Sequence, residues 1–407
     1  MPTRPATGQP PRQLFATTPE QRTAQARLRF FDEGDRPSGL VGEDVLQSWM
    51  RCRRRHEDPR RAIAFDPVTP SRLHGALARN RALLEAAGPE LASMEGALAG
   101  TDCRVILTDR EGVLLHVTHH PMAPQQPVLS STARLGVNLA ESVVGTTAPG
   151  IVLSTGQACT VDGGEHYFDS LRQVHCAAAP IRGVDGRLAG VLDLSVEARR
   201  FGFDAGAMVG LYATVIENRL LARQSAGHVV LRFQASPALL DTPLEAMAGV
   251  APDGRVAWLN AAAARLLGPL PAEPLARAAV RFFGRDLNGL LRLAGGHGAQ
   301  ALRLGSGLGV WAKVRLPCSD GLNLRHGVAL PAAPRALPAA VAPAAPAHAT
   351  PTHDDAPPAT LRGQQQDLIA RTLQENGGNI ARTARQLGVS RGTLYRRLRE
   401  GGVAPQG

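Results

Sequence analysis

The chain has 407 residues, with 45 lysines and arginines against 35 acidic residues and a formal net charge of +10. This length exceeds the size at which a single core usually stops growing, so we expect two or three domains. No apolar run is long enough to cross a membrane, which excludes a membrane-spanning helix, and the basic balance favours a polyanionic partner.

The five cysteines are widely spaced, at Cys52, Cys103, Cys159, Cys176 and Cys318. This spacing fits neither a zinc site nor a disulfide framework and favours a reducing cytosol. The first 29 residues lack the apolar core of a signal peptide. We therefore expect a cytoplasmic protein with a disordered start over residues 1–41.

After this start, apolar residues recur at the spacing of amphipathic helices. Over residues 42–58, apolar side chains are mixed with the arginines Arg51, Arg53, Arg54 and Arg55, which predicts a helix with a solvated basic end. Leucines over residues 69–100 predict one or two further amphipathic helices.

Short apolar segments broken by turn residues come next. Residues 105–108 and 113–117 flank the sequence DREG, and residues 177–181 and 188–196 flank VDGR, so each pair predicts a hairpin. The last of these strands is apolar almost throughout and should be central and buried. With an exit helix, these elements predict an α+β sensory domain at residues 42–224.

Residues 225–330 predict a less regular second unit. It contains two strands around the turn Pro252-Asp253-Gly254, followed by an alanine-rich helix. Residues 331–359 are an Ala/Pro tract without aromatic residues, which predicts a semi-stiff linker.

The carboxy-terminal segment predicts a three-helix DNA-binding domain at residues 360–403. Gly388 supplies the tight corner between its second and third helices. On the third helix Thr393, Arg396 and Arg397 point outward, away from the apolar positions. The segment holds eight arginines against three acidic residues, which is half of the chain's excess positive charge.

Residues 379–398, NIARTARQLGVSRGTLYRRL, resemble the Fis-type helix-turn-helix. In that family the residues that match these positions contact DNA: Asn379, Arg382, Ser390, Arg391, Thr393 and Arg396. Together with the outward-facing Arg397, they are the predicted DNA-binding residues. Fis-type domains usually act as dimers, which implies a homodimer on double-stranded DNA with two half-sites about one helical turn apart.

Separated blocks of the first domain resemble the GAF domain of acetoin-catabolism-type regulators, members of the sigma-54 activator family: ESVVGTTAPG (141–150), EHYF (165–168), CAAAPI (176–181) and GVLDLS (190–195). The sequence GRVAWLN (254–260) resembles a PAS domain. The expected fold class is multidomain α+β, with a GAF-like α/β sensor, a PAS-like α+β domain and an all-α three-helix helix-turn-helix.

A GAF-like sheet with helices around it can enclose a small-molecule effector. Residues in segments that could line such a pocket are Tyr167, Phe168, His175, Cys176 and Asp193. Each of these residue types is more often structural, since a free cysteine at a strand start usually packs as a small hydrophobe.

The family's central AAA+ ATPase is missing from this pattern. No Gly-x-x-x-x-Gly-Lys-Ser/Thr loop occurs, and Lys313 is the only lysine, so we expect no ATP hydrolysis. Neither catalytic residues nor a cofactor are predicted, because no nucleophile can be paired with a base. The histidines His116, His119 and His120 match no defined ligand set, so no metal is predicted.

These features predict a sequence-specific transcriptional regulator whose GAF-like domain senses a metabolite and modulates DNA binding. Repression, competition with a full-length paralogue and activation through RNA polymerase are all compatible with it. The alternative is a Fis-like architectural DNA-binding protein with a dimerising amino-terminal region. An enzyme would need a catalytic constellation that we do not find.

Overall fold

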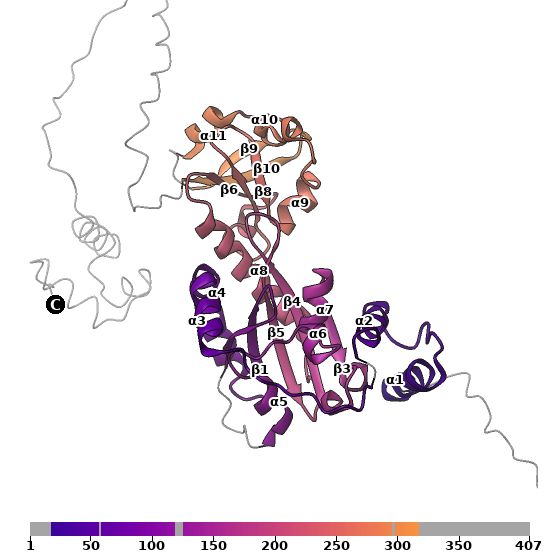
Figure 1. The fold of residues 1–407 in the computed structure, drawn as a ribbon. Helices are drawn as coiled ribbons and strands as arrows, with labels where there is room; N and C mark the ends of the chain where they lie inside the picture. Colours follow the sequence, from indigo (N-terminus) through magenta and orange to yellow (C-terminus); the bar gives the residue numbers. More distant parts are fainter. Residues whose placement is uncertain (1–17, 57, 119–124, 295–297, 317–407) are drawn as a thin grey trace, which may run out of the picture. The chain divides into compact units, whose positions relative to one another are not determined.

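The computed structural model describes residues 18–56, 58–118, 125–294 and 298–316 (Figure 1). The predicted linker at 331–359 and the predicted helix-turn-helix at 360–403 lie outside these residues. The described part is a mixed α+β fold with two five-stranded antiparallel sheets, in agreement with the expected fold class. No helix within it combines the length and apolar character needed to cross a membrane.

The first sheet has the strand order β2-β1-β5-β4-β3. Its strands are β1 (Arg104–Asp109), β2 (Leu114–Val117), β3 (Cys159–Asp162), β4 (Val174–Arg182) and β5 (Leu188–Glu197). Both predicted hairpins are confirmed, as β1 with β2 and β4 with β5, and β5 is the central strand, as predicted.

Helices surround this sheet: α2 (Glu43–Arg53), α3 (Pro70–Arg79), α4 (Arg81–Leu98), α5 (Pro127–Thr132), α6 (Glu141–Val144), α7 (Ala148–Thr155) and α8 (Ala205–Gln224). The short 3-10 turns η3 (Gly163–Glu165) and η4 (Asp169–Leu171) connect β3 to β4. The predicted helices over residues 42–58 and 69–100 are thus confirmed, and so is the predicted exit helix, which is α8.

The two faces of the first sheet bury different side chains, because successive residues of a strand point to opposite faces. Leu192 and Leu194 of β5 pack in a core that includes residues of α4 and α8. Val191 belongs to another core, formed with residues of α2 and α7. Figure 1 shows α4 and α7 on opposite sides of the sheet.

The second sheet has the order β8-β7-β6-β10-β9. Its strands are β6 (Val229–Gln234), β7 (Ala246–Val250), β8 (Val256–Leu259), β9 (Gln300–Arg303) and β10 (Gly309–Arg315). Its helical segments are η5 (Pro237–Leu239), α9 (Ala261–Leu267), η6 (Pro274–Arg277), α10 (Ala279–Phe283) and α11 (Leu287–Ala294). The predicted turn joins β7 to β8, with Gly254 at φ +79°. The PAS-like assignment of this unit and the predicted domain boundaries stay predictions.

The prediction of a disordered start is wrong for residues 18–33, which form α1 (Pro19–Arg27) and the π-helix η1 (Leu28–Glu33). The Thr18 hydroxyl accepts a hydrogen bond from the Gln21 N–H, and the Gln21 side chain accepts one from the Thr18 N–H. Only Ala26, Arg27 and Phe30 of this segment are buried. They are too few to form the apolar stripe by which an amphipathic helix is predicted from sequence.

Arg27 attaches α1 to the segment after β3. Its guanidinium donates hydrogen bonds to the backbone carbonyls of Gly164 (3.0 Å), His166 (2.6 Å) and Tyr167 (3.2 Å), and pairs with Asp169 at 2.7 Å. The side chain is only 8% exposed. Burial lowers the pKa of Arg27 to about 10, which leaves it charged at neutral pH.

We expect Arg27→Ala to destabilise the protein by about 3 kcal/mol, because the substitution leaves buried carbonyls without a donor. Thermal unfolding measures the effect. The control is Arg36→Ala, which removes an exposed pair with Glu43 and should leave the unfolding midpoint nearly unchanged. Equal midpoints for the two variants would show that Arg27 does not hold α1 in place.

Candidate functional site

The predicted DNA-contacting residues, from Asn379 to Arg397, lie outside the described residues. The candidate site that the structure describes is therefore in the domain of the first sheet. An internal cavity of about 30 Å³ lies there, on the face of β5 opposite Leu192 and Leu194. Its walls are mainly apolar and include Ile106 of β1 and Leu129 of α5.

Asp193 of β5 is the unusual member of this wall. It is fully buried, and its Oδ2 accepts a hydrogen bond from the Ser195 hydroxyl at 2.7 Å, while Oδ1 has no hydrogen-bond partner. Burial raises the pKa of Asp193 to about 7, although the Ser195 hydrogen bond opposes the shift. A buried carboxyl oxygen without a donor is costly, so this atom is a ready acceptor for a bound molecule.

Cys176 and His166 also line the cavity, but they satisfy each other. The Nδ1 of His166 lies 2.9 Å from the Gly163 carbonyl, to which it donates, so Nε2 is left as an acceptor. The Cys176 sulfur is 3.4 Å from this Nε2. Burial lowers the pKa of His166 to about 4 and raises that of Cys176, so both groups are neutral at physiological pH.

Three of the predicted effector residues are not among the side chains that line this cavity. Tyr167 and Phe168 are fully buried in the core beside α2 and α7, where the Tyr167 hydroxyl donates to the His56 carbonyl at 2.5 Å. His175 faces Asp162, with Nδ1 2.9 Å from its Oδ1. Cys176 and Asp193 are the predicted effector residues that the structure brings together.

Sequence reasoning missed four polar residues of this wall: Thr132, Thr147, His166 and Ser195. Ser195 is two positions after Asp193 and therefore faces the same way, a period-2 signal that was available in the sequence. His166 was not among the predicted effector residues, because its distance from Cys176 depends on how β3 and β4 pair. His119 and His120 lie outside the described residues.

The cavity is small for a metabolite. A volume of about 30 Å³ holds one or two water molecules, whereas pockets for organic ligands typically measure about 300–1,000 Å³. Binding a larger molecule would require a lining side chain to move. Phe65, which is only partly buried and precedes α3, is the most exposed aromatic side chain of the wall.

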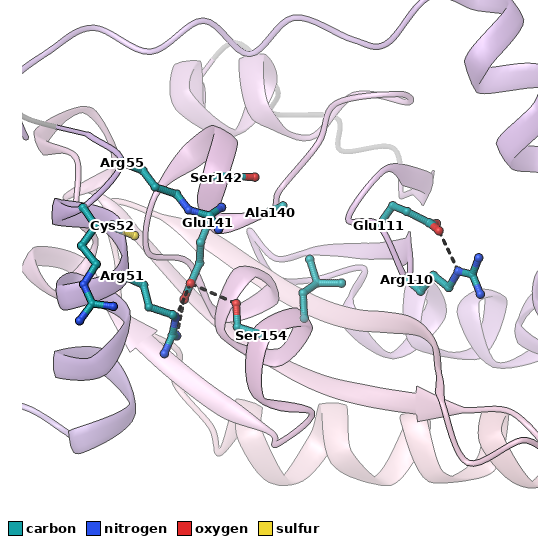
Figure 2. A pocket seen from close by; sticks show the side chains of 11 residues that line it. Arg51, Cys52, Arg55, Arg110, Glu111, Ala140, Glu141, Ser142 and Ser154 are labelled. Carbon is teal, nitrogen blue, oxygen red and sulfur yellow. Dashed lines mark hydrogen bonds and ion pairs between the residues drawn. The ribbon is translucent and has the colours of Figure 1, made fainter.

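A separate, open cleft of about 380 Å³ lies between α2, the β1–β2 turn, α6 and α7 (Figure 2). At its base, the buried Glu141 accepts hydrogen bonds from the Arg51 guanidinium through both oxygens, each at 2.7 Å. The hydroxyls of Ser48 and Ser154 donate to the same carboxylate at 2.6 and 3.0 Å. This pair could not be predicted from sequence patterns, because its members are 90 residues apart.

We call this feature the arginine cleft, because four arginines line it: Arg51, Arg54, Arg55 and Arg110. Figure 2 shows Arg51 and Arg55 on one side and the Arg110–Glu111 pair on the other. The predicted solvated helix end is correct for Arg54 and Arg55, which are exposed, but not for Arg51, which ends in a partly buried ion pair.

Two family models match the chain. Residues 18–208 match the MimR N-terminal domain, and residues 360–401 match the Fis family of bacterial regulatory proteins. The second match falls on the predicted helix-turn-helix.

Curated relatives match the same amino-terminal part. The propane 2-monooxygenase operon transcriptional activator MimR of Mycolicibacterium smegmatis is 31% identical over 180 residues, which are 43% of this chain and 29% of that protein. The acetoin dehydrogenase operon transcriptional activator AcoR of Bacillus subtilis is 28% identical over 217 residues, 51% of this chain and 35% of that protein. The acetoin catabolism regulatory protein of Cupriavidus necator is 29% identical over 236 residues, 56% and 35% of the two chains. The aligned part thus spans about a third of the length of these relatives.

A solved structure was also matched. A chain of the E. coli DhaR(N)–DhaL complex aligns with a TM-score of 0.43 and 17% identity, covering 67% of this chain and 99% of that one. The assignment of the two domains rests on the family models and the curated relatives. The chain joins a MimR-type N-terminal domain at residues 18–208 to a Fis-family helix-turn-helix sequence at residues 360–401, and its homologues are transcriptional activators of the AcoR and MimR type.

Proposed function

We propose that the chain is a DNA-binding transcriptional regulator in which the MimR-type domain binds a small metabolite and thereby changes DNA binding by the Fis-family segment. The joint presence of the two family matches carries this proposal. A metabolite can act in this way only if it binds two arrangements of the protein with different affinities.

The Fis-family segment supplies the DNA-binding half of the proposal. Asn379, Arg391 and Arg396 are among its predicted contacts, and arginines suit both phosphate and guanine. We propose that it acts as a homodimer, as Fis-type domains usually do. We also propose that it acts without ATP hydrolysis, since the sequence shows no phosphate-binding loop.

We expect Arg396→Ala to weaken binding to a specific site upstream of the regulated genes by about tenfold or more, because a base contact is worth about 1–3 kcal/mol. Fluorescence anisotropy across a salt series measures this loss. The control is Arg362→Ala, which removes the same charge near the start of the predicted three-helix domain, outside the predicted DNA contacts, and should weaken binding to all DNA sequences alike. Binding that depends on salt but shows no site preference would favour an architectural protein instead.

The internal cavity supplies the sensing half. Its walls are mainly apolar, and its unsatisfied atom is the Oδ1 of Asp193. A compact, mostly apolar molecule with one hydroxyl or amide donor would match both features. Because the cavity is small, its occupation would have to move the surrounding elements, which gives binding a way to alter the rest of the protein.

Acetoin, which appears in the names of two relatives, is the first probe. We expect saturating acetoin to raise the unfolding midpoint and change the affinity for specific DNA, because a ligand that binds only the folded state stabilises it. Asp193→Asn should abolish both responses while DNA binding without acetoin persists. Asp185→Asn, in the exposed β4–β5 turn, is the matched control and should respond like the original protein. Specific DNA binding that no tested hydroxylated metabolite alters would contradict the sensing half alone.

Asp193 also predicts how stability depends on pH. Its pKa of about 7 in the folded state lies above the ordinary 3.8, so between these values the folded protein holds a proton that the unfolded chain has released. The contribution of Asp193 to stability therefore falls as pH rises from 3.8 to about 7. We expect Asp193→Asn to gain stability relative to the original protein over this range, as measured by urea unfolding at several pH values. A pH-independent difference would show that Asp193 titrates normally.

A further inference from the structure

We propose that the arginine cleft is a second ligand site, separate from the internal cavity, and that it binds a small-molecule dianion: a phosphate monoester or a dicarboxylate. This inference does not depend on the proposed function.

The charge of the cleft favours an anion. Its four arginines face two glutamates, which leaves a net charge of +2 in the lining. The carboxylate of Glu141 already has Arg51 as its counterion and two hydroxyl donors, so its capacity to accept hydrogen bonds is largely used. On the other side, Glu111 pairs with Arg110.

Arg54 and Arg55 carry the uncompensated charge. Neither forms an ion pair with any acidic residue in the part of the chain that the structure describes, and both side chains are exposed. A guanidinium presents a planar fork of donors that matches phosphate and carboxylate oxygens. Two such groups, together with the outer face of Arg51, fit a ligand with two negative charges.

The backbone that carries these arginines is held in place. The N–H groups of Arg55 and His56 both donate to the Cys52 carbonyl, at 2.9 and 2.8 Å. The Nε2 of His56 lies 3.1 Å from the Glu141 carbonyl, and the carbonyl of His56 accepts the Tyr167 hydroxyl. The segment is thus fixed on both sides of the arginine pair, which reduces the entropy lost when a ligand orders their side chains.

The size of the cleft indicates a small molecule. Its volume of about 380 Å³ lies within the range of about 300–1,000 Å³ that is typical of ligand pockets. The exposed Ser142 and Ser154 add hydroxyl groups to the same wall. These can contact neutral parts of a ligand whose charged groups lie on the arginines.

Calorimetric titration of the full chain at constant ionic strength tests the proposal. The probes are glycerol 3-phosphate, succinate and, as the uncharged comparison, glycerol. We expect saturable binding of at least one dianion and none of glycerol; which dianion binds decides between phosphate and dicarboxylate.

The double variant Arg54→Gln/Arg55→Gln should weaken this binding at least about tenfold, because the ligand loses its charge-assisted hydrogen bonds to both guanidinium groups. The matched control, Arg72→Gln/Arg79→Gln, removes the same charge from exposed positions of α3 outside the cleft and should retain the affinity. Unchanged unfolding midpoints show that both variants fold. The proposal is overturned if neither dianion binds at millimolar concentration, or if the two double variants weaken binding equally.

Discussion

The register of β5 between β1 and β4 is the constraint on which the first domain depends. Asp193 lies opposite Ile106 of β1 and Ala178 of β4. This register sends Leu192 and Leu194 into the core with α4 and α8, and it sends Asp193 and Ser195 to the cavity. A slip of one residue would exchange the faces and place a carboxyl group among leucines, which is strongly unfavourable.

Several arginines that raise the net charge are used inside the fold and do not attract a polyanion. Arg27 and Arg51 end in buried or partly buried ion pairs. The guanidinium of Arg104 donates to the Gln126 side chain at 2.9 Å, and that of Arg182 donates to the Gly156 carbonyl at 2.5 Å. Net charge alone is therefore a poor guide to a nucleic-acid partner here; the position of each arginine decides what it does.

The strands and long helices of the first domain could be predicted because their signals are local. Each hairpin has turn residues between apolar runs, and Gly186 adopts the left-handed φ of +73° that the β4–β5 turn needs. The amino-terminal helices could not, since α1 is held by Arg27 through carbonyls more than 130 residues away. In the candidate site, the structure brings Cys176 and Asp193 together and places Tyr167 and Phe168 in the core beside α2 and α7, while effector binding by any of them stays a prediction. Aromatic residues suit both a pocket wall and a core, and only the packing of Tyr167 against Phe31 and His56 decides between them.

The chemistry of Cys176 makes the cavity observable. Its thiol is 3% exposed and its pKa is raised by burial, so the closed protein should hardly react with a thiol reagent. Modification requires the wall between α7 and β4 to open and admit the reagent. The rate at which Cys176 is alkylated therefore reports how often the wall opens. It measures the motion by which an effector would enter the cavity.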